Sequence, residues 1–188
     1  MPNPRAVLRA EILAAALKHV PFDGWTLAAL ERGALESGRQ RADAARAFPG
    51  GPAEAIALLS ELANARMRSA ITARDLSALR FRARVAEAVM ARLGEVPREV
   101  ERQALAYLAL PGHAVLAARL LWNTSDALWR AVGDTATDFS YYSKRATLGA
   151  VYAATLLVWL DDDSADKAAT RAFLNRRIEG VMRFGKAR

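Results

Sequence analysis

The 188-residue chain contains no cysteine and only two histidines. Without cysteine it can form no disulfide, no thiolate nucleophile and no cysteine-ligated metal site. His19 and His113 stand far apart in the sequence, so a histidine-rich metal cluster or a Ser-His-Asp arrangement lacks the residues it needs. Hydrolytic catalysis is therefore not expected, and no resident metal or cofactor is predicted.

Long hydrophobic runs are also missing. The N-terminal residues have no continuous apolar stretch of the kind found in signal peptides, because Glu11 interrupts the apolar run there. The longest uncharged apolar run, residues 146–160, is about fifteen residues long, whereas a helix that spans a bilayer needs roughly twenty. These two absences predict a soluble protein, and the lack of cysteine fits a reducing compartment.

The net charge of +7 shows an excess of cations over acidic side chains. A field of this sign attracts nucleic acid, anionic lipid headgroups and acidic proteins alike, so the charge by itself does not choose a partner. The simplest interpretation of the arginines, which gather in the middle of the chain and near its C-terminus, is a solvated basic helix face.

Strand signals are almost absent, and much of the apolar share of 53% is alanine, which favours closely packed helices. Apolar residues recur at helical spacing in segments separated by proline and glycine. The sequence therefore predicts an all-α protein. The expected helices cover residues 5–20, 26–38, 39–48, 53–70, 76–93, 98–109, 114–132, 139–160 and a last amphipathic segment after Ser164.

The first three predicted helices have the outline of a helix-turn-helix. We therefore expect a three-helix subdomain over residues 1–51 and a helical bundle over residues 52–188, together forming one compact unit. Asp43 lies on the helix that would read DNA and would face phosphate unfavourably. A purely structural subdomain is thus preferred over DNA reading, although that helix also carries Arg39, Arg41 and Arg46.

Acidic residues in two places could suggest chemistry. Asp161, Asp162 and Asp163 could hold a hard cation, but they lack a spacing such as that of the EF-hand, so a polar linker with helix capping by Ser164 is preferred. Asp134 and Asp138 could form a general-acid pair. A hydrogen-bonded corner between these aspartates and a nearby arginine is the favoured interpretation.

Residues 108–113 form a corner that is more apolar than most loops. Loops are normally polar and solvated. Two interpretations remain open: the corner is buried beneath a neighbouring segment, or it is a docking patch.

Residues 128–145 carry a recognisable motif, W-x-x-x-G-D-x-x-T-D-x-x-x-Y-x-x-R. It resembles that of the ubiquinone-biosynthesis accessory family, the ninth protein of the Coq series. The resemblance continues to Leu160 and covers most of the chain, including 24–26 and 108–111. The fixed positions of the motif are filled by Trp129, Gly133, Asp134, Thr137, Asp138, Tyr142 and Arg145.

The resemblance implies a TetR-repressor-like helical fold without DNA reading, and a non-catalytic, homodimeric protein that binds an isoprenoid quinone intermediate or a phospholipid. It further implies that the bound quinone is presented to the di-iron hydroxylase that acts on demethoxyubiquinone. Bundle helices with few charges suit such an apolar cavity. The expected lipid-binding residues are Leu121, Trp122, Leu148, Val151, Tyr152, Thr155, Leu156 and Trp159.

The resemblance also implies a surface that binds the hydroxylase. Aromatic anchors are favoured at such interfaces. The residues expected there are Leu108, Leu110, Pro111, Asp138, Tyr141, Tyr142 and Arg145.

Many relatives continue into a further amphipathic helix that enters the membrane, whereas this sequence ends at Arg188. We therefore expect at most weak contact of the basic tail with an anionic membrane surface. The expected location is the cytoplasm or the inner-membrane surface of a bacterium, or the matrix side in a mitochondrion. The alternative to the accessory role is a TetR-like regulator that senses a ligand and binds DNA.

Overall fold

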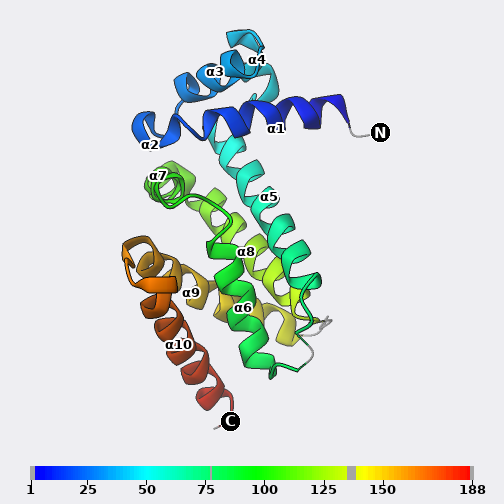
Figure 1. The fold of residues 1–188 in the computed structure, drawn as a ribbon, viewed down its shortest axis with the longest axis vertical. Coiled ribbons are helices and arrows are strands. Elements are labelled where there is room, and N and C mark those ends of the chain that lie inside the picture. Colours follow the sequence, from blue (N-terminus) through cyan, green and yellow to red (C-terminus); the bar gives the residue numbers. More distant parts are fainter. Residues whose placement is uncertain (1–2, 77, 135–138, 187–188) are drawn as a thin grey trace. The chain divides into compact units, whose positions relative to one another are not determined.

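The computed structural model describes residues 3–76, 78–134 and 139–186, and these ranges contain helices and connections but no β-strand. The predicted all-α class is thereby confirmed. The elements, coloured along the chain in Figure 1, are α1 (Pro4–Ala16), α2 (Val20–Asp23), α3 (Leu27–Glu36), α4 (Arg41–Ala47), α5 (Pro52–Thr72), α6 (Phe81–Leu93), α7 (Arg98–Leu108), η1 (Pro111–His113), α8 (Ala114–Ala131), α9 (Phe139–Asp161), η2 (Ala165–Lys167) and α10 (Ala168–Lys186).

The chain packs as two compact units. The N-terminal unit contains Met1–Glu61 and Pro97–Ala117, and the C-terminal unit contains Leu62–Val96 and Ala118–Arg188. Helix α7 therefore packs with α1–α4 although it is distant from them in sequence. The expected division after residue 51 follows the chain order and stays a prediction. Grouping by packing is a different description, in which residues 97–117 join the N-terminal unit.

Close packing of α1 on α3 forms the core of the N-terminal unit. Ile12, Ala16 and Val20 lie on the predicted apolar stripe and are all fully buried. Gly33 of α3 allows this approach, because a Cβ built there would lie 2.6 Å from the Ile12 carbonyl oxygen and 2.7 Å from the Ala16 Cβ. A side chain at this position would push the two helices apart.

Local hydrogen bonds determine where α3 begins and how α7 is attached. The Thr26 side chain accepts a hydrogen bond from the Ala29 backbone N–H at 3.2 Å, which confirms Thr26 as the N-cap of α3. Just before it, the buried Trp25 directs its indole Nε1 to the Val100 carbonyl oxygen at 3.4 Å. This contact joins the α2–α3 turn to α7 within the N-terminal unit.

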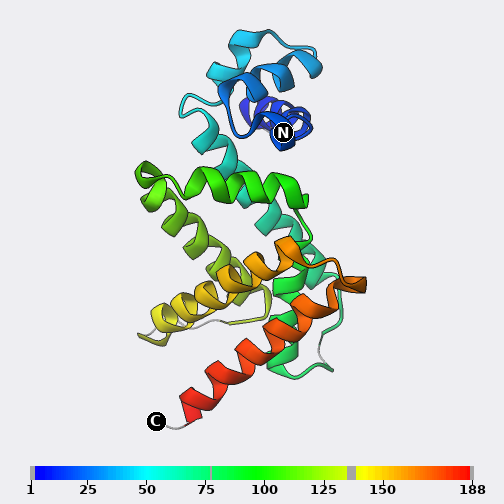
Figure 2. The ribbon, with the colours of Figure 1, turned by 90° about the vertical axis from the view of Figure 1, so that its left-hand side faces the viewer.

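Helix α9 occupies a central position in the C-terminal unit, where it packs against α10 and α6 (Figure 2). Tyr152, Leu156 and Trp159 of α9 are at most 7% exposed. Helix α8 approaches α9 closely at Gly149, where an added Cβ would lie 2.9 Å from the Ser125 Oγ. The burial of α9 confirms the expectation that this helix is central to the bundle.

Two boundaries differ from the sequence prediction: α1 ends at Ala16, not at residue 20, and α6 begins later than expected. Helix α6 begins at Phe81, not at residue 76, because Arg80 has an extended backbone and serves as the N-cap. Between α9 and α10, the Asp162 carboxylate accepts hydrogen bonds from the Thr170 backbone N–H at 2.7 Å and from the Ser164 backbone N–H at 2.9 Å. Hydrogen bonds from the Ser164 and Thr170 hydroxyls, with a smaller contribution from these backbone bonds, hold the pKa of Asp162 well below its usual range. The aspartate run is thus a capping linker, as preferred.

Replacement of Gly33 with alanine should destabilise the N-terminal unit by about 1–3 kcal/mol, because the added methyl group has no space between α1 and α3. The matched control is Gly180→Ala in α10, where a Cβ would meet nothing within 4 Å. There alanine should be neutral or slightly stabilising. Urea unfolding followed by circular dichroism measures both effects, and equal stability of the two variants would contradict the packing of Gly33.

Candidate functional site

An apolar groove of about 370 Å³ lies among four helices of the C-terminal unit. This volume falls within the range of roughly 300–1,000 Å³ that is typical of small-molecule sites. Helices α6, α8, α9 and α10 all contribute to the walls, so the groove depends on the tertiary packing of the unit. Its lining residues are Phe81, Arg82, Val85, Trp129, Ser143, Lys144, Thr147, Leu148, Val151, Ile178 and Val181.

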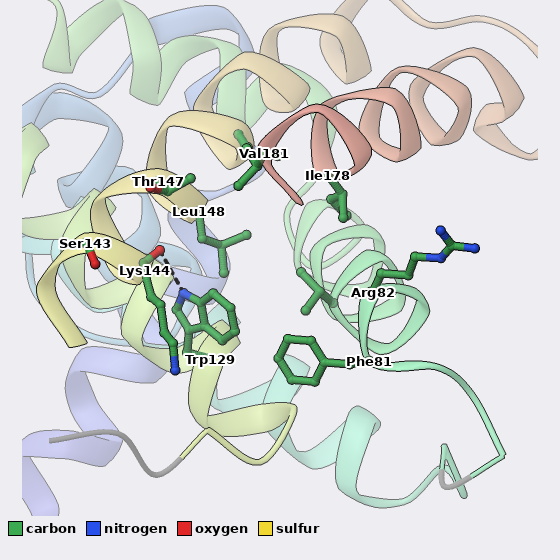
Figure 3. A pocket seen from close by; sticks show the side chains of 11 residues that line it. Phe81, Arg82, Trp129, Ser143, Lys144, Thr147, Leu148, Ile178 and Val181 are labelled. Atoms are coloured by element: carbon green, nitrogen blue, oxygen red, sulfur yellow. Dashed lines mark hydrogen bonds between the residues drawn. The ribbon is translucent and has the colours of Figure 1, made fainter. Parts of the chain in front are cut away.

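An aromatic pair, Phe81 of α6 and Trp129 of α8, forms part of the groove wall (Figure 3). The two rings stack with their centroids 5.6 Å apart and an interplanar angle of 22°. The indole Nε1 of Trp129 donates a hydrogen bond to the Lys144 carbonyl oxygen at 3.0 Å. Because this bond uses the indole N–H, Trp129 offers the groove its apolar ring and no hydrogen-bond donor.

The groove is partly open to solvent. Phe81 and Val181 are each 41% exposed, although both are large apolar side chains. Leu148 and Val151, in contrast, are buried. An open apolar concavity of this kind costs free energy when it faces water, and that cost is relieved when an apolar ligand fills it.

A buried ionic network joins α8 to the start of α9, next to the groove. Arg145 is only 1% exposed, and its Nε donates a hydrogen bond to Asp126 Oδ1 at 2.7 Å. Its Nη1 donates to the Tyr141 carbonyl oxygen at 3.2 Å and lies 3.5 Å from Asp134 Oδ2. The guanidinium carbon stands 3.4 Å from the Tyr141 ring centroid. Arg145 therefore ties together two carboxylates and one aromatic ring.

One carboxylate of this network, Asp126, has a lowered pKa. Burial alone would raise the pKa of Asp126, but hydrogen bonds from Arg145 and Arg130 outweigh it and leave that pKa below the usual value. Asp134 also accepts a hydrogen bond from Lys144 Nζ at 2.9 Å. The favoured aspartate–arginine corner is thus confirmed for Asp134, whereas Asp138 lies outside the described residues.

The expected lipid-binding residues divide into two groups in the structure. Leu148 and Val151 line the groove. The remaining six residues are not among its lining residues: Tyr152, Thr155, Leu156 and Trp159 are buried in the core, Leu121 packs near Gly149, and Trp122 contacts the rings of Tyr141 and Tyr142.

Several lining residues were missed by sequence reasoning. Trp129 belongs to the recognised motif, and that position was a signal that could have identified it. Phe81, Val85, Ile178 and Val181 carry no comparable signal, because periodicity shows that a helix face is buried without showing what it faces. Asp126 was also missed, although it stands four residues before Arg130, a spacing that brings two side chains together on one face of a helix.

The residues expected to bind the hydroxylase also divide into exposed and buried ones. Tyr142 is 62% exposed and packs edge-on against Tyr141, with the ring centroids 5.1 Å apart. Together with Trp122 they form an aromatic cluster on the C-terminal unit. Arg145 lies beneath this cluster and positions Tyr141, so its own side chain is not at the surface.

In the N-terminal unit, Leu110 is 52% exposed and Pro111 is also exposed, while Leu108 is half-buried. Of the two interpretations of this corner, a buried one is therefore wrong for Leu110. His113 stacks on the Tyr107 ring with the centroids 4.1 Å apart and so fixes the corner locally. The role of this corner in binding a partner stays a prediction.

The arginines of α3–α4 that could contact DNA are engaged with acidic side chains. Arg39 pairs with Glu11 at 2.9 Å, and Arg46 pairs with Asp43 at 3.0 Å. Arg41 lies 3.7 Å from a glutamate of α3. This local neutralisation weakens the attraction that phosphate contacts require.

Metal-binding clusters and membrane-spanning helices are two further features that bear on function. Within residues 3–76, 78–134 and 139–186, no group of three or more His, Asp or Glu side chains is arranged to hold a metal ion. In the same ranges no single helix has the length and apolar character to cross a membrane, whereas the bent pair Arg98–Leu108 and Pro111–Ala131 meets both criteria.

The helix arrangement defines an all-helical, TetR-like fold. The structure is similar to that of a TetR transcriptional regulator from Nitrosomonas europaea, with a TM-score of 0.72 over 93% of this chain and 97% of the other. The two sequences are 18% identical, so this likeness shows the fold alone. The predicted TetR-like fold is thereby confirmed.

Sequence relationships give a narrower comparison, and the chain is similar to proteins of the COQ9 family. Residues 114–185 match the model of that family. The rat and human proteins named ubiquinone biosynthesis protein COQ9, mitochondrial, are each 33% identical to this chain over 187 residues, which is 95% of this chain and 60% and 58% of theirs. A Drosophila melanogaster protein of that name is also 33% identical, over 93% of this chain. The predicted resemblance to this family is confirmed.

The chain spans about 60% of the length of the curated relatives named above. Their names describe mitochondrial proteins of ubiquinone biosynthesis. The matched region, residues 114–185, includes α8, α9 and most of α10, and therefore three of the four helices that form the groove.

Replacement of Arg145 with leucine should lower the free energy of unfolding by about 3 kcal/mol, because it leaves Asp126 and Asp134 without their buried cation. Arg130→Leu is the matched control, since Arg130 also pairs with Asp126 but its side chain is 63% exposed. The control should change stability little. Urea titrations of both variants provide the measurement, and a control as unstable as Arg145→Leu would refute the special role of the buried arginine.

Proposed function

We propose that the chain is a non-catalytic accessory protein of ubiquinone biosynthesis that holds an isoprenoid quinone intermediate in the groove of its C-terminal unit. The observation that carries this proposal is an open apolar groove in a chain related to COQ9 proteins. An isoprenoid chain gains free energy by leaving water for such a groove. A phospholipid tail is the second ligand that this wall chemistry suits.

The proposal assigns binding, not chemistry, to the groove. The carboxylates beside it, Asp126 and Asp134, serve as partners of Arg130, Lys144 and Arg145. The pKa of Asp126 lies below its usual value, which suits a structural role for this carboxylate better than proton transfer near neutral pH.

The aromatic cluster of Trp122, Tyr141 and Tyr142 is proposed to contact the di-iron hydroxylase of ubiquinone biosynthesis. Aromatic side chains supply large contact areas at protein interfaces. Tyr142 is 62% exposed on this chain, so it is available for such contact. Exposed Leu110 and Pro111 of the N-terminal unit are proposed as a second contact region for the same partner.

The proposal also includes a homodimer that works beside a membrane, with weak attraction of the basic chain to anionic headgroups. Because the rat and human relatives are named as mitochondrial, the matrix side of the inner membrane is the proposed location for a eukaryotic source. For a bacterial source the corresponding place is the cytoplasmic side. The regulator alternative is not favoured, since the paired arginines of α4 leave DNA without strong phosphate contacts.

Val181→Asp should weaken lipid binding about tenfold or more, because a lipid tail in the groove would then bury a carboxylate. The matched control is Leu157→Asp, whose parent side chain is 61% exposed on α9 and is not among the groove residues. Mass spectrometry of organic extracts from the purified proteins measures co-purified isoprenoid and phospholipid. Equal lipid content in both variants, or none in the parent protein, would count against the groove.

Tyr142→Ala should leave the helical fold intact and weaken binding of the hydroxylase, with a rise of demethoxyubiquinone in cells. Leu110→Ala tests the second contact region in the same way, and the two substitutions together should give a larger rise. Circular dichroism, co-purification with the hydroxylase and quinone ratios in extracts are the measurements. Unchanged quinone ratios in the double variant would rule out the assigned surface.

A further inference from the structure

The groove changes in character from one end to the other. Ser143 and Val151 both line it from α9 and stand eight residues apart, which corresponds to about 12 Å along the helix axis. Ser143 lies at the end of the groove that contains Trp129, because Trp129 donates to the backbone of the next residue, Lys144. Val151 marks the opposite end.

Polar groups gather at the Ser143 end. Ser143 and Lys144 line the groove there, and Thr147 lines it midway between Ser143 and Val151; all three side chains are exposed or partly exposed. At the Val151 end the lining is aliphatic: Val151 is 8% exposed and Val85 of α6 is 5% exposed. The groove therefore has an open polar end and a closed apolar end.

Lys144 has the chemistry to recognise a polar head at the open end. Its ammonium carries three hydrogen-bond donors, of which the bond to Asp134 uses one. Arg82 also lines the groove, but Figure 3 shows its guanidinium directed away from the other lining side chains, whereas the Lys144 ammonium lies beside Trp129. Lys144 is thus the better placed of these two cations.

The net charge of the ionic network around Lys144 indicates which type of head group the groove would bind. Its described members are three cations, Arg130, Lys144 and Arg145, and two carboxylates, Asp126 and Asp134, which leaves one positive charge in excess. Lys144 Nζ also stands 5.7 Å from the Trp129 ring centroid, so it already holds the position that a quaternary ammonium would take on this ring. A choline head is therefore disfavoured, and acceptor oxygens are favoured.

We propose that the groove binds an amphiphile in one orientation, with an oxygen-bearing head against Lys144 and Trp129 and an apolar chain running toward Val85 and Val151. This inference rests on the proposed function, which identifies the head as a quinone ring. The stacked rings of Phe81 and Trp129 provide an apolar wall beside the head, and Lys144 donates to a ring carbonyl oxygen. Lys144 is then the residue that distinguishes a quinone from a bare isoprenoid chain.

The test uses displacement of the apolar dye N-phenyl-1-naphthylamine from the full chain by three ligands. They are a ubiquinone analogue with three isoprene units, farnesene as the same length of chain without a head, and dioctanoyl phosphatidylglycerol. Lys144→Met should weaken binding of the quinone about tenfold, because a charge-assisted hydrogen bond is lost. Farnesene should bind within about twofold of the parent value, since it makes no hydrogen bond.

Three variants serve as controls. Lys144→Arg keeps the charge and the donors and should restore most of the quinone affinity. Arg176→Met removes an exposed cation of α10 that does not line the groove and should leave quinone affinity within about twofold of the parent. Lys144→Gln removes the charge but retains a hydrogen-bond donor for Asp134. It replaces Lys144→Met in the test if circular dichroism shows that Lys144→Met is not folded.

The outcomes separate this inference from the proposed function. If the parent protein takes up neither the dye nor any ligand, the groove function and the orientation both fail. If the parent binds the quinone but Lys144→Met weakens quinone and farnesene equally, the orientation fails and the groove function stands. A selective loss confined to phosphatidylglycerol would overturn the quinone assignment and identify the head as a phosphate.

Discussion

The side chain on which the C-terminal unit most depends is the buried guanidinium of Arg145. A cation that is 1% exposed is stable only when its lost hydration is replaced, and Asp126, Asp134 and the Tyr141 carbonyl oxygen replace it. Because Asp126 lies on α8 and Asp134 follows that helix, while Arg145 lies on α9, these bonds determine how the start of α9 meets α8. One wall of the groove and the aromatic cluster both follow from this arrangement.

The same network separates polar from apolar chemistry within a short length of α9. Lys144 and Arg145 are adjacent, yet the buried Arg145 pairs with the carboxylates of Asp126 and Asp134 while Lys144 reaches the groove and shares Asp134. From Leu148 onward the groove wall of α9 is apolar. A groove built in this way has a direction, which a uniformly aliphatic cavity would not have.

The N-terminal unit keeps the compact helical core of its fold. Gly33 and Ala16 allow α1 and α3 to pack closely, and Trp25 fastens α7 to them. Arg39 and Arg46, meanwhile, are paired with acidic side chains. A shared fold therefore carries no DNA function by itself, since function depends on the groups at the site.

The sequence alone was sufficient for the helical class, most helix boundaries and the family resemblance. Proline and glycine interrupt helices for local reasons, so residues such as Pro49 and Gly133 mark breaks without reference to tertiary structure. The start of α6 was placed too early, because the extended backbone of Arg80 leaves no composition signal. The expected aspartate–arginine corner also placed Asp134 beside Arg145.

The tertiary structure decided which buried residues surround an open space. Tyr152, Trp159, Leu148 and Val151 all belong to the same apolar segment of the sequence. In the structure the first two fill the core, whereas the last two line the groove. Helical periodicity reports that a face is buried, but only the packing of α6, α8 and α10 against α9 determines whether that face meets atoms or a cavity. The burial of Arg145 could not be predicted from the sequence either, because its partner Asp126 lies on a different helix.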